Sequence, residues 1–239
     1  MKKNSTYFDK KFSNYWDELI NWKLRFSKTT NKLSSILNKH NCKNVLDVAA
    51  GTGFDSISLS IKKFIVTSQD ISKEMLEKLN LNALNNNVNI KTICAPWDKY
   101  NSKINFFDAI ICLGNSFVCE LNKKKRTLAI INWYRLLKKK GIIIIDHRNY
   151  EKIKKSKKNL KSYNYSGKAK ITCKKLNDYY SFKYKFSEGI ELNLKMYPVL
   201  MSELINKFKE NKFTYLYTLY DYNLRKNKNC KFYQHIFVK

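Results

Sequence analysis

The feature that most constrains the fold is a regular alternation in the first 150 residues, where short apolar runs alternate with stretches of helical spacing. The runs expected to be strands are 44–49, 65–70, 89–94, 107–114 and 141–146. The stretches expected to be helices are 54–64, 72–87 and 124–140. Strands joined through helices pair in parallel, and the helices cover both faces of the sheet. The run GIIIID at 141–146 is apolar on both faces, which indicates a central strand of a parallel α/β sheet.

The pattern changes after residue 150, where apolar and polar residues alternate in 168–176, 179–186 and 190–197. This alternation is typical of antiparallel strands, and SEG at 187–189 suits a hairpin turn. A helical stretch at 199–213 and two further strand-like runs at 214–222 and 231–239 complete the chain. We therefore expect one domain over 1–239, with a small antiparallel insert near 150–197 that forms a lid over the carboxyl edge of the main sheet.

The formal net charge is +28, from 42 lysines, five arginines and 19 acidic residues. Such a charge promotes non-specific binding of polyanions at low salt. The lysines are spread along the whole chain, however, and the sequence contains no arginine-rich strip and no aromatic RNA-binding motif. A basic nucleic-acid-binding protein therefore remains the alternative from another class, not the leading interpretation.

Membrane, metal and disulfide sites are all disfavoured. The chain has no stretch of about 18 uncharged apolar residues, and its N-terminus lacks the apolar region of a signal peptide. Its six cysteines and three histidines are far apart and show no metal-ligand spacing. We expect a cytoplasmic protein with reduced thiols and no metal.

Two of the six glycines, Gly51 and Gly53, lie in the turn after the first strand, where the backbone must approach a ligand closely. The dinucleotide fingerprint would place a third glycine or alanine at position 56, which is Ser56. The missing fingerprint favours a nucleoside without a pyrophosphate. Asp70 ends the second strand, where an acid can accept hydrogen bonds from ribose hydroxyls. The alternative is that Asp70 caps the next helix, although Ser72 is better placed for that role.

Arg148 follows the buried run at 141–146, at the edge where open α/β sheets bind ligands. Its planar guanidinium can hold a carboxylate through two parallel hydrogen bonds, which lysine cannot do. The alternative is a structural ion pair with Asp146, Asp108 or another acid. Asn115 follows Gly114 at the end of the fourth strand and should lie beside Arg148, unless it only closes an Asx-turn.

The motifs VLDVAAGTGFDS, VTSQD, APW and FDAIICLGNSF resemble those of the class I S-adenosylmethionine-dependent methyltransferases, which have a Rossmann-like sheet. LGNSF together with HRNY is narrower and resembles glycine N-methyltransferase and the microbial glycine/sarcosine N-methyltransferases. The resemblance runs from YFDKKF near the N-terminus to the terminal FYQHIFVK. It implies S-adenosyl-L-methionine as the cofactor and N-methylation of glycine, and also of sarcosine, as in the first steps of glycine betaine synthesis.

The resemblance also implies a role for individual residues. An N-terminal segment, 1–40, would close over the cofactor. The cofactor-binding residues would be Tyr7, Trp16, Arg25, Ala49, Gly51, Gly53, Asp70, Pro96, Trp97 and Leu113, with Arg25 pairing with the methionine carboxylate. The residues around the amino-acid substrate would be Asn115, Arg148, Tyr197 and one or both of Tyr163 and Tyr165.

Two positions depart from the family pattern. Pro96 stands where an asparagine or aspartate usually precedes the tryptophan, so only backbone groups could read the adenine there. Cys119 stands where the family usually carries a histidine, and Glu120 follows. The sequence leaves open the acceptor among small carboxylated amines, dimethylglycine and guanidino acids included. It also leaves open the number of methyl groups added and whether the chain forms a homo-oligomer.

Overall fold

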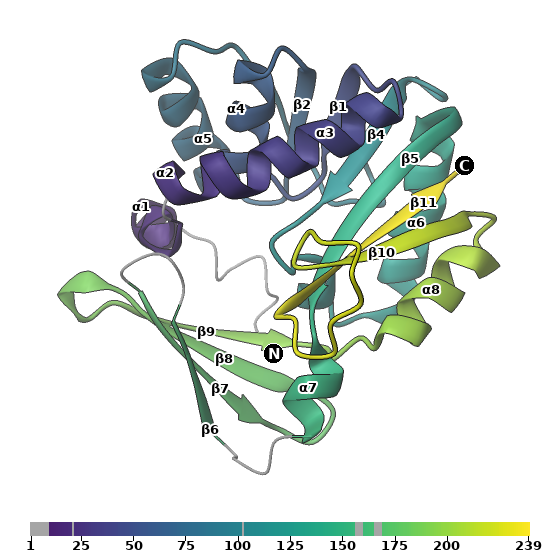
Figure 1. Ribbon diagram of the computed structural model, residues 1–239. Helices are drawn as coiled ribbons and strands as arrows, with labels where there is room; N and C mark the ends of the chain where they lie inside the picture. The colour runs from purple at the N-terminus through teal and green to yellow at the C-terminus, as the bar shows by residue number, and fades with distance from the viewer. Residues whose placement is uncertain (1–9, 21, 102, 156–159, 165–168) are drawn as a thin grey trace.

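The computed structural model describes residues 10–20, 22–101, 103–155, 160–164 and 169–239, and these form two sheets. The larger sheet has the strand order β10-β11-β5-β4-β1-β2-β3 (Figure 1). Its strands are β1 (Asn44–Asp47), β2 (Ile65–Asp70), β3 (Lys91–Cys94), β4 (Phe107–Cys112), β5 (Leu137–Arg148), β10 (Thr214–Tyr220) and β11 (Phe232–Val238). The strands from β3 to β5 are parallel, whereas β11 is antiparallel to both of its neighbours. The predicted α/β sheet is confirmed.

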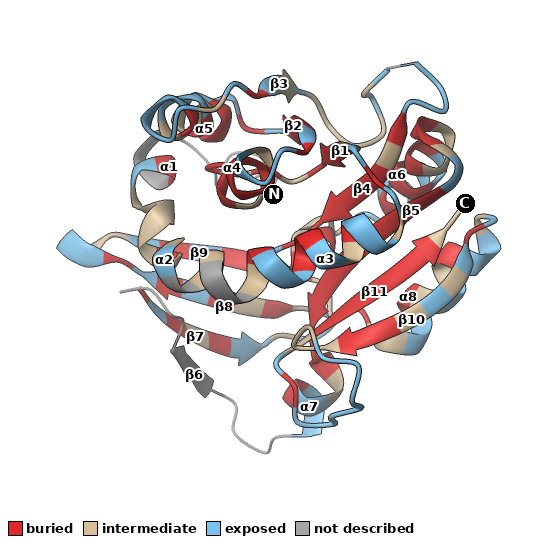
Figure 2. Ribbon diagram, turned by 45° about the horizontal axis from the view of Figure 1, so that its top comes forward, coloured by how far each residue is buried: buried red, intermediate tan, exposed pale blue. Residues whose placement is uncertain are grey.

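The centre of the core is β5, because the side chains of Ile142–Ile145 are fully buried on both faces of the sheet. Ile143 and Ile145 pack in one apolar cluster with α6 (Lys123–Leu136) and α8 (Met201–Glu210). Ile142 and Ile144 pack in a second cluster with α3 (Asn31–Lys39) and α4 (Phe54–Ile61). Burying one such side chain stabilises a fold by about 1.5–3 kcal/mol. Helices therefore cover both faces of the sheet, with their buried sides turned inward (Figure 2).

The smaller sheet is antiparallel and has the order β6-β7-β8-β9. Its strands are β6 (Leu160–Asn164), β7 (Lys170–Lys175), β8 (Tyr180–Lys185) and β9 (Glu191–Met196), and the turn η5 (Ser187–Gly189) joins the last two as predicted. Figure 1 shows this sheet beyond the carboxyl ends of β4 and β5. Phe182 and Leu194 belong to the same apolar cluster as Ile143 and Ile145. The two sheets thus share one core.

The N-terminal residues form a run of short helices that leads into α3. These are α1 (Lys10–Trp16), η2 (Asp17–Leu19), α2 (Trp22–Arg25) and the π-helical turn η3 (Phe26–Thr30). Figure 1 shows α1 between α5 (Lys73–Asn85) and the hairpin that joins β8 to β9. This position brings Trp16 and Asp17 close to the loop that follows β1.

One predicted boundary is wrong. The helix expected over 124–140 ends at Leu136, and the three lysines 138–140 belong to β5. Leu137 pairs with Phe107 of β4, and the Lys138 ammonium lies 2.6 Å from Asp108, so sheet contacts replace helical ones here. The helices between residues 10 and 39 were not predicted, and neither were β6 and α7 (Tyr150–Lys155). In the part of the chain that the structure describes, no helix has the length and apolarity needed to cross a membrane.

Candidate active site

The loop after β1 has the conformation that its glycines suggest. Gly53 has a φ of +97° and precedes α4, and a Cβ there would lie 2.6 Å from Leu79 Cγ. Gly51 has a φ of +53°, yet a Cβ there would meet only Trp16 Nε1, at 3.7 Å. Gly53 is therefore required by packing against α5, whereas Gly51 faces a more open space. Ala49, two residues before Gly51, has its backbone nitrogen 3.3 Å from Asp47 Oδ1.

Asp70 closes this loop from β2. Its Oδ2 accepts a hydrogen bond from the Gly51 N–H at 2.8 Å, and its Oδ1 accepts one from the Ser72 N–H at 3.0 Å. Ser72 caps α5, because its hydroxyl accepts from the Met75 N–H. Burial raises the pKa of Asp70, and the N–H donors oppose this shift. Each carboxylate oxygen has a second lone pair for another donor, so the geometry suits the predicted binding of ribose hydroxyls.

Asp47 was not predicted as a site residue, and it lies just below the same loop. Its Oδ2 accepts a hydrogen bond from the Ser56 hydroxyl at 2.7 Å, and Ser68 in turn donates to Ser56. Burial and the nearby charge of Asp55 raise the pKa of Asp47 to about 7. Ser56, which takes the place of the third glycine of a dinucleotide fingerprint, thus holds the buried acid of β1. Strand-end acids of this kind were visible in the sequence, but their hydrogen-bond partners were not.

The N-terminal helices contact this loop and the start of α4. Asp17 accepts a hydrogen bond from the Thr52 hydroxyl, and Trp16 packs against the ring of Tyr184 in β8, with 5.9 Å between centroids. Arg25 lies over the ring of Phe54, and its Nη2 is 3.2 Å from Asp55. Trp16 and Arg25 therefore lie beside the glycine loop, where the resemblance expects them. Tyr7 lies outside the described residues.

The predicted adenine side of the site is built around Trp97. Its indole N–H donates to the carbonyl of Val48 at 2.5 Å, and its ring stacks on Phe117 with centroids 6.1 Å apart. The carbonyl of Pro96 accepts a hydrogen bond from Gln69 Nε2 at 3.1 Å. Leu113 is buried at the end of β4, and its carbonyl accepts from the Ser116 hydroxyl. The side-chain amide of Gln69 thus fixes the loop that contains Pro96, whose side chain has no hydrogen-bond acceptor.

Asn115 connects the ends of both sheets. Its backbone N–H donates to Asp146 Oδ1 at 2.6 Å, and its side-chain oxygen accepts from the Arg148 N–H at 2.9 Å. Its side-chain nitrogen lies 3.3 Å from the Tyr150 hydroxyl and 3.1 Å from Met196 Sδ in β9. Asn115 is thus more than the Asx-turn considered from the sequence, and it lies directly beside Arg148.

Arg148 is the last residue of β5 and is buried, with 4% of its surface exposed. Its guanidinium carbon lies 5.2 Å from the ring centre of Phe182 in the small sheet and 5.0 Å from that of Phe232 in β11. The two acids named from the sequence as ion-pair partners of Arg148 each have a contact elsewhere. Asp108 binds Lys138, and Asp146 binds the Asn115 N–H. Burial raises the pKa of Asp146 to about 6.

The predicted tyrosines have different positions. Tyr197 follows β9, and the Arg126 guanidinium lies 4.3 Å from the centre of its ring. Tyr163 belongs to β6, opposite Ile171, and Tyr165 lies outside the described residues. Cys119 has its Sγ 3.8 Å from the carbonyl of Asn115, and burial raises its pKa to about 12, so it is a neutral thiol.

Tyr222 was missed by the sequence analysis. It lies in the loop after β10 with a φ of +61°. Burial and then the negative charges of Asp146 and Asp55 raise the pKa of its phenol, whereas the charge of Arg25 lowers it. The positive φ of Tyr222 had no signal in the sequence.

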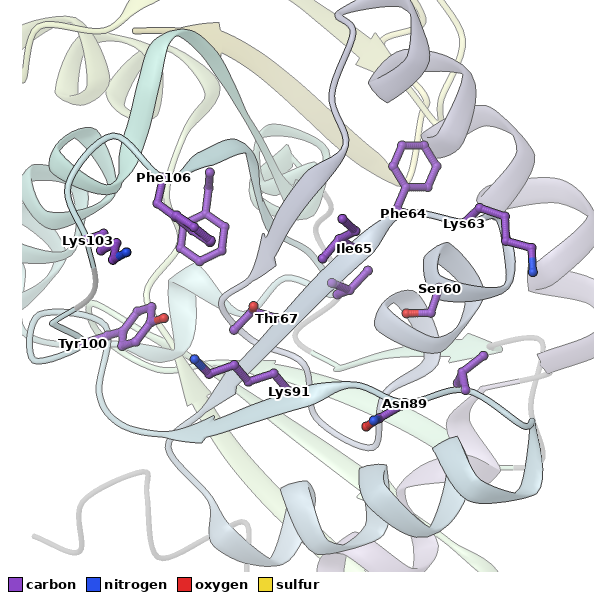
Figure 3. A pocket seen from close by; sticks show the side chains of 13 residues that line it. Ser60, Lys63, Phe64, Ile65, Thr67, Asn89, Lys91, Tyr100, Lys103 and Phe106 are labelled. Carbon is purple, nitrogen blue, oxygen red and sulfur yellow. The ribbon is translucent and has the colours of Figure 1, made fainter.

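The residues present fit an adenosyl cofactor. The loop at Gly51 leaves room for close approach, an acid at the end of β2 faces that loop, and an indole lies on the next loop. A cavity of about 820 Å³ lies elsewhere, at the amino ends of β2 and β3 (Figure 3). It is lined by Thr67, Lys91 and Tyr100 among others, and it contains none of the predicted site residues.

Comparison with known proteins supports the same assignment. A family model described as "Methyltransferase domain" matches residues 45–141. A glycine/sarcosine N-methyltransferase of Parasynechococcus marenigrum (strain WH8102) is 34% identical over 95% of this chain and 83% of its own length. One of Aphanothece halophytica is 38% identical over 79% of this chain and 72% of its own length.

The fold has a match among solved structures. An S-adenosylmethionine-dependent methyltransferase from Clostridium acetobutylicum ATCC 824 superposes with a TM-score of 0.77 at 20% identity, covering 95% of this chain and 97% of its own. This likeness confirms the Rossmann-like methyltransferase fold. The sequence relatives define the narrower group, and the chain belongs to the glycine/sarcosine N-methyltransferase family of S-adenosylmethionine-dependent enzymes.

Proposed function

We propose that the protein transfers methyl groups from S-adenosylmethionine to the nitrogen of glycine and of sarcosine. The observation that carries this proposal is the position of Arg148. Its guanidinium lies between two aromatic rings, one from each sheet, and directly beside Asn115 at the carboxyl edge of the main sheet. A buried arginine at this edge suits a small carboxylated substrate, because its fork can bind both carboxylate oxygens.

The reaction places few chemical demands on the protein. When bound, S-adenosylmethionine supplies an electrophilic methyl group on a sulfonium sulfur. The chain must hold a neutral amine in line with that group, and such orientation is worth up to roughly 7–11 kcal/mol. Arg148 would bind the carboxylate and so direct the amine of glycine away from the guanidinium. Asn115 accepts a hydrogen bond from the backbone N–H of Arg148, and Asp146 accepts one from the backbone N–H of Asn115, so the backbone at Arg148 is held in place.

The cofactor would be held along the loop that follows β1. Asp70 would accept hydrogen bonds from the ribose hydroxyls, and Trp97 would flank the adenine. Arg25 would exchange its present partner Asp55 for the methionine carboxylate. The N-terminal helices and the small sheet would then close the site of this single 1–239 domain. The small sheet would act as a lid that keeps water from the reacting groups.

The deciding experiment is product analysis with labelled S-adenosylmethionine and three acceptors in parallel, namely glycine, sarcosine and dimethylglycine. We expect label in sarcosine and dimethylglycine when the acceptors are glycine and sarcosine, as required for the early steps of glycine betaine synthesis. An absence of labelled product with both would overturn the proposal. Methyl transfer that occurs only when dimethylglycine is the acceptor, or only with a guanidino acid added as a fourth acceptor, would show that the site serves another small carboxylated amine.

A further inference from the structure

Two buried histidines lie on the side of Arg148 away from Asn115. His147 precedes Arg148 in β5, and His235 lies on the neighbouring strand β11. Their Nε2 atoms are 2.9 Å apart, and the exposed fractions of the two residues are 1% and 0%. The mechanism proposed above uses neither ring, so their burial in direct contact requires another explanation.

The two rings are part of a longer chain of hydrogen bonds that crosses three strands. His147 Nδ1 lies 2.8 Å from the carbonyl oxygen of Arg148. His235 Nδ1 lies 2.7 Å from the hydroxyl of Thr218 in β10. The Thr218 hydroxyl lies 2.8 Å from the hydroxyl of Tyr215, a half-buried residue of the same strand.

Only one arrangement of protons satisfies the whole chain when both rings are neutral. A carbonyl oxygen can only accept, so His147 carries its proton on Nδ1 and leaves Nε2 bare. His235 must then donate from Nε2, and its bare Nδ1 accepts from Thr218. The Thr218 oxygen accepts in turn from Tyr215. Every bond therefore points in the same direction, from Tyr215 toward the carbonyl of Arg148.

This chain and Asn115 together fix Arg148 from both sides. The N–H of Arg148 donates to Asn115 Oδ1, and its carbonyl accepts from His147. These two groups belong to the two peptide planes that flank the Arg148 Cα atom. Holding both planes fixes the φ and ψ of the residue, and with them the direction in which its side chain leaves the backbone.

We propose that His147 and His235 are positioning residues for the acceptor site, acting through the Arg148 carbonyl to hold the guanidinium in line for the substrate carboxylate. The proposal rests on the clamp role given to Arg148 above. It assigns no contact between either histidine and the substrate.

The surroundings of the pair keep both rings neutral. The titratable and charged groups that face them come from β5, α7, β10 and β11, and they are Arg148, Tyr150, Glu151, Tyr215 and Tyr233. Burial lowers the pKa of His147 to about 4, although the Arg148 carbonyl and Glu151 oppose this shift. Burial and the neighbouring His147 lower the pKa of His235 well below its usual value. At neutral pH each ring therefore carries one proton, as the chain requires.

The test compares two substitutions at one position. His147→Phe removes the donor to the Arg148 carbonyl, whereas His147→Asn keeps an N–H close to the position of Nδ1. We expect His147→Phe to raise the KM for glycine about 10- to 100-fold, since small misplacements of a binding group have effects of this size. His147→Asn should recover most of the loss, and the Kd for S-adenosylmethionine should stay within about twofold of wild type in both. Equal loss in the two variants, or equal weakening of glycine and cofactor binding, would refute the positioning role.

A spectroscopic measurement on the wild-type protein tests the same hydrogen bonds without requiring that the His147 variants fold. The chain has only three histidines, and His40→Gln assigns the third by the disappearance of its signals. Long-range ¹H–¹⁵N correlation at pH 7 should show His147 protonated on Nδ1 and His235 on Nε2. The opposite tautomers, or a charged ring, would overturn the proposal. If the wild-type protein does not methylate glycine, the proposed function fails. The tautomers of His147 and His235 still decide whether the series of hydrogen bonds from Tyr215 to the Arg148 carbonyl exists.

Discussion

The substitution Arg148→Lys tests whether the guanidinium binds the substrate carboxylate. Lysine keeps the positive charge but provides a single point of contact, so one of two charge-assisted hydrogen bonds is lost, at about 1.5–3 kcal/mol. The ammonium also cannot lie flat between the rings of Phe182 and Phe232, which costs about 1 kcal/mol more. The sum of about 2.5–4 kcal/mol corresponds to a KM for glycine that is about 70- to 900-fold higher.

The assay measures initial rates of methyl transfer over a range of glycine concentrations, and calorimetry gives the Kd for S-adenosylmethionine. We expect that Kd to stay within about twofold of wild type, because Arg148 does not border the glycine loop. Arg225→Lys is the matched control, since Arg225 is exposed in the loop between β10 and β11. A rise in the glycine KM of less than about tenfold, or equal loss of glycine and cofactor binding, would refute the clamp.

Three further predictions concern the loop after β1 and the strand-end acids beside it. Asp70→Asn should weaken S-adenosylmethionine binding by about 10- to 100-fold in calorimetry, since a neutral amide accepts more weakly from ribose hydroxyls; an unchanged Kd would contradict this role. Gly53→Ala should lower the free energy of unfolding in urea by about 1–3 kcal/mol more than Gly51→Ala, because only the Cβ at 53 meets Leu79 at 2.6 Å. The pKa of Asp47 is raised to about 7 in the folded state, so the stability linked to its proton is present below pH 4 and is lost as pH rises through 7. Asp47→Asn should therefore flatten the fall in Tm between pH 5 and pH 8, and an unchanged slope in scanning calorimetry would contradict this.

The sequence predicted the strands well because their apolar runs are short and separated. The α/β class and the parallel pairing followed from that pattern, and β2 matches its predicted bounds. The order of the strands in the sheet was not predicted. The boundary between α6 and β5 could not be predicted, because Leu136 and Leu137 continue the apolar pattern without a break. The pairing of Leu137 with Phe107, thirty residues earlier, decides it.

The site was predictable only in part, for a similar reason. Arg148, Asn115 and Asp70 stand at strand ends, and strand ends can be read from the sequence. The bonds that orient them cannot, since they depend on how distant strands align. His147 and His235 are 88 residues apart, and nothing in either local pattern indicates that their rings meet. Pairing of β5 with β11 brings them together.

The strand β9 is held very differently at its two ends. At one end Met196 is buried against Asn115 and Tyr150, inside the core shared by both sheets. At the other end the hairpin meets the N-terminal helices through exposed hydrogen bonds, from Tyr15 to Glu188 and from Ser187 to Glu18, and through ring contacts of Tyr15 with Phe186 and of Trp16 with Tyr184. As the proposed lid, the small sheet would open at this second end, where the hydrogen bonds are exposed. We therefore expect a substrate to enter between the hairpin and helix α1 rather than past Met196.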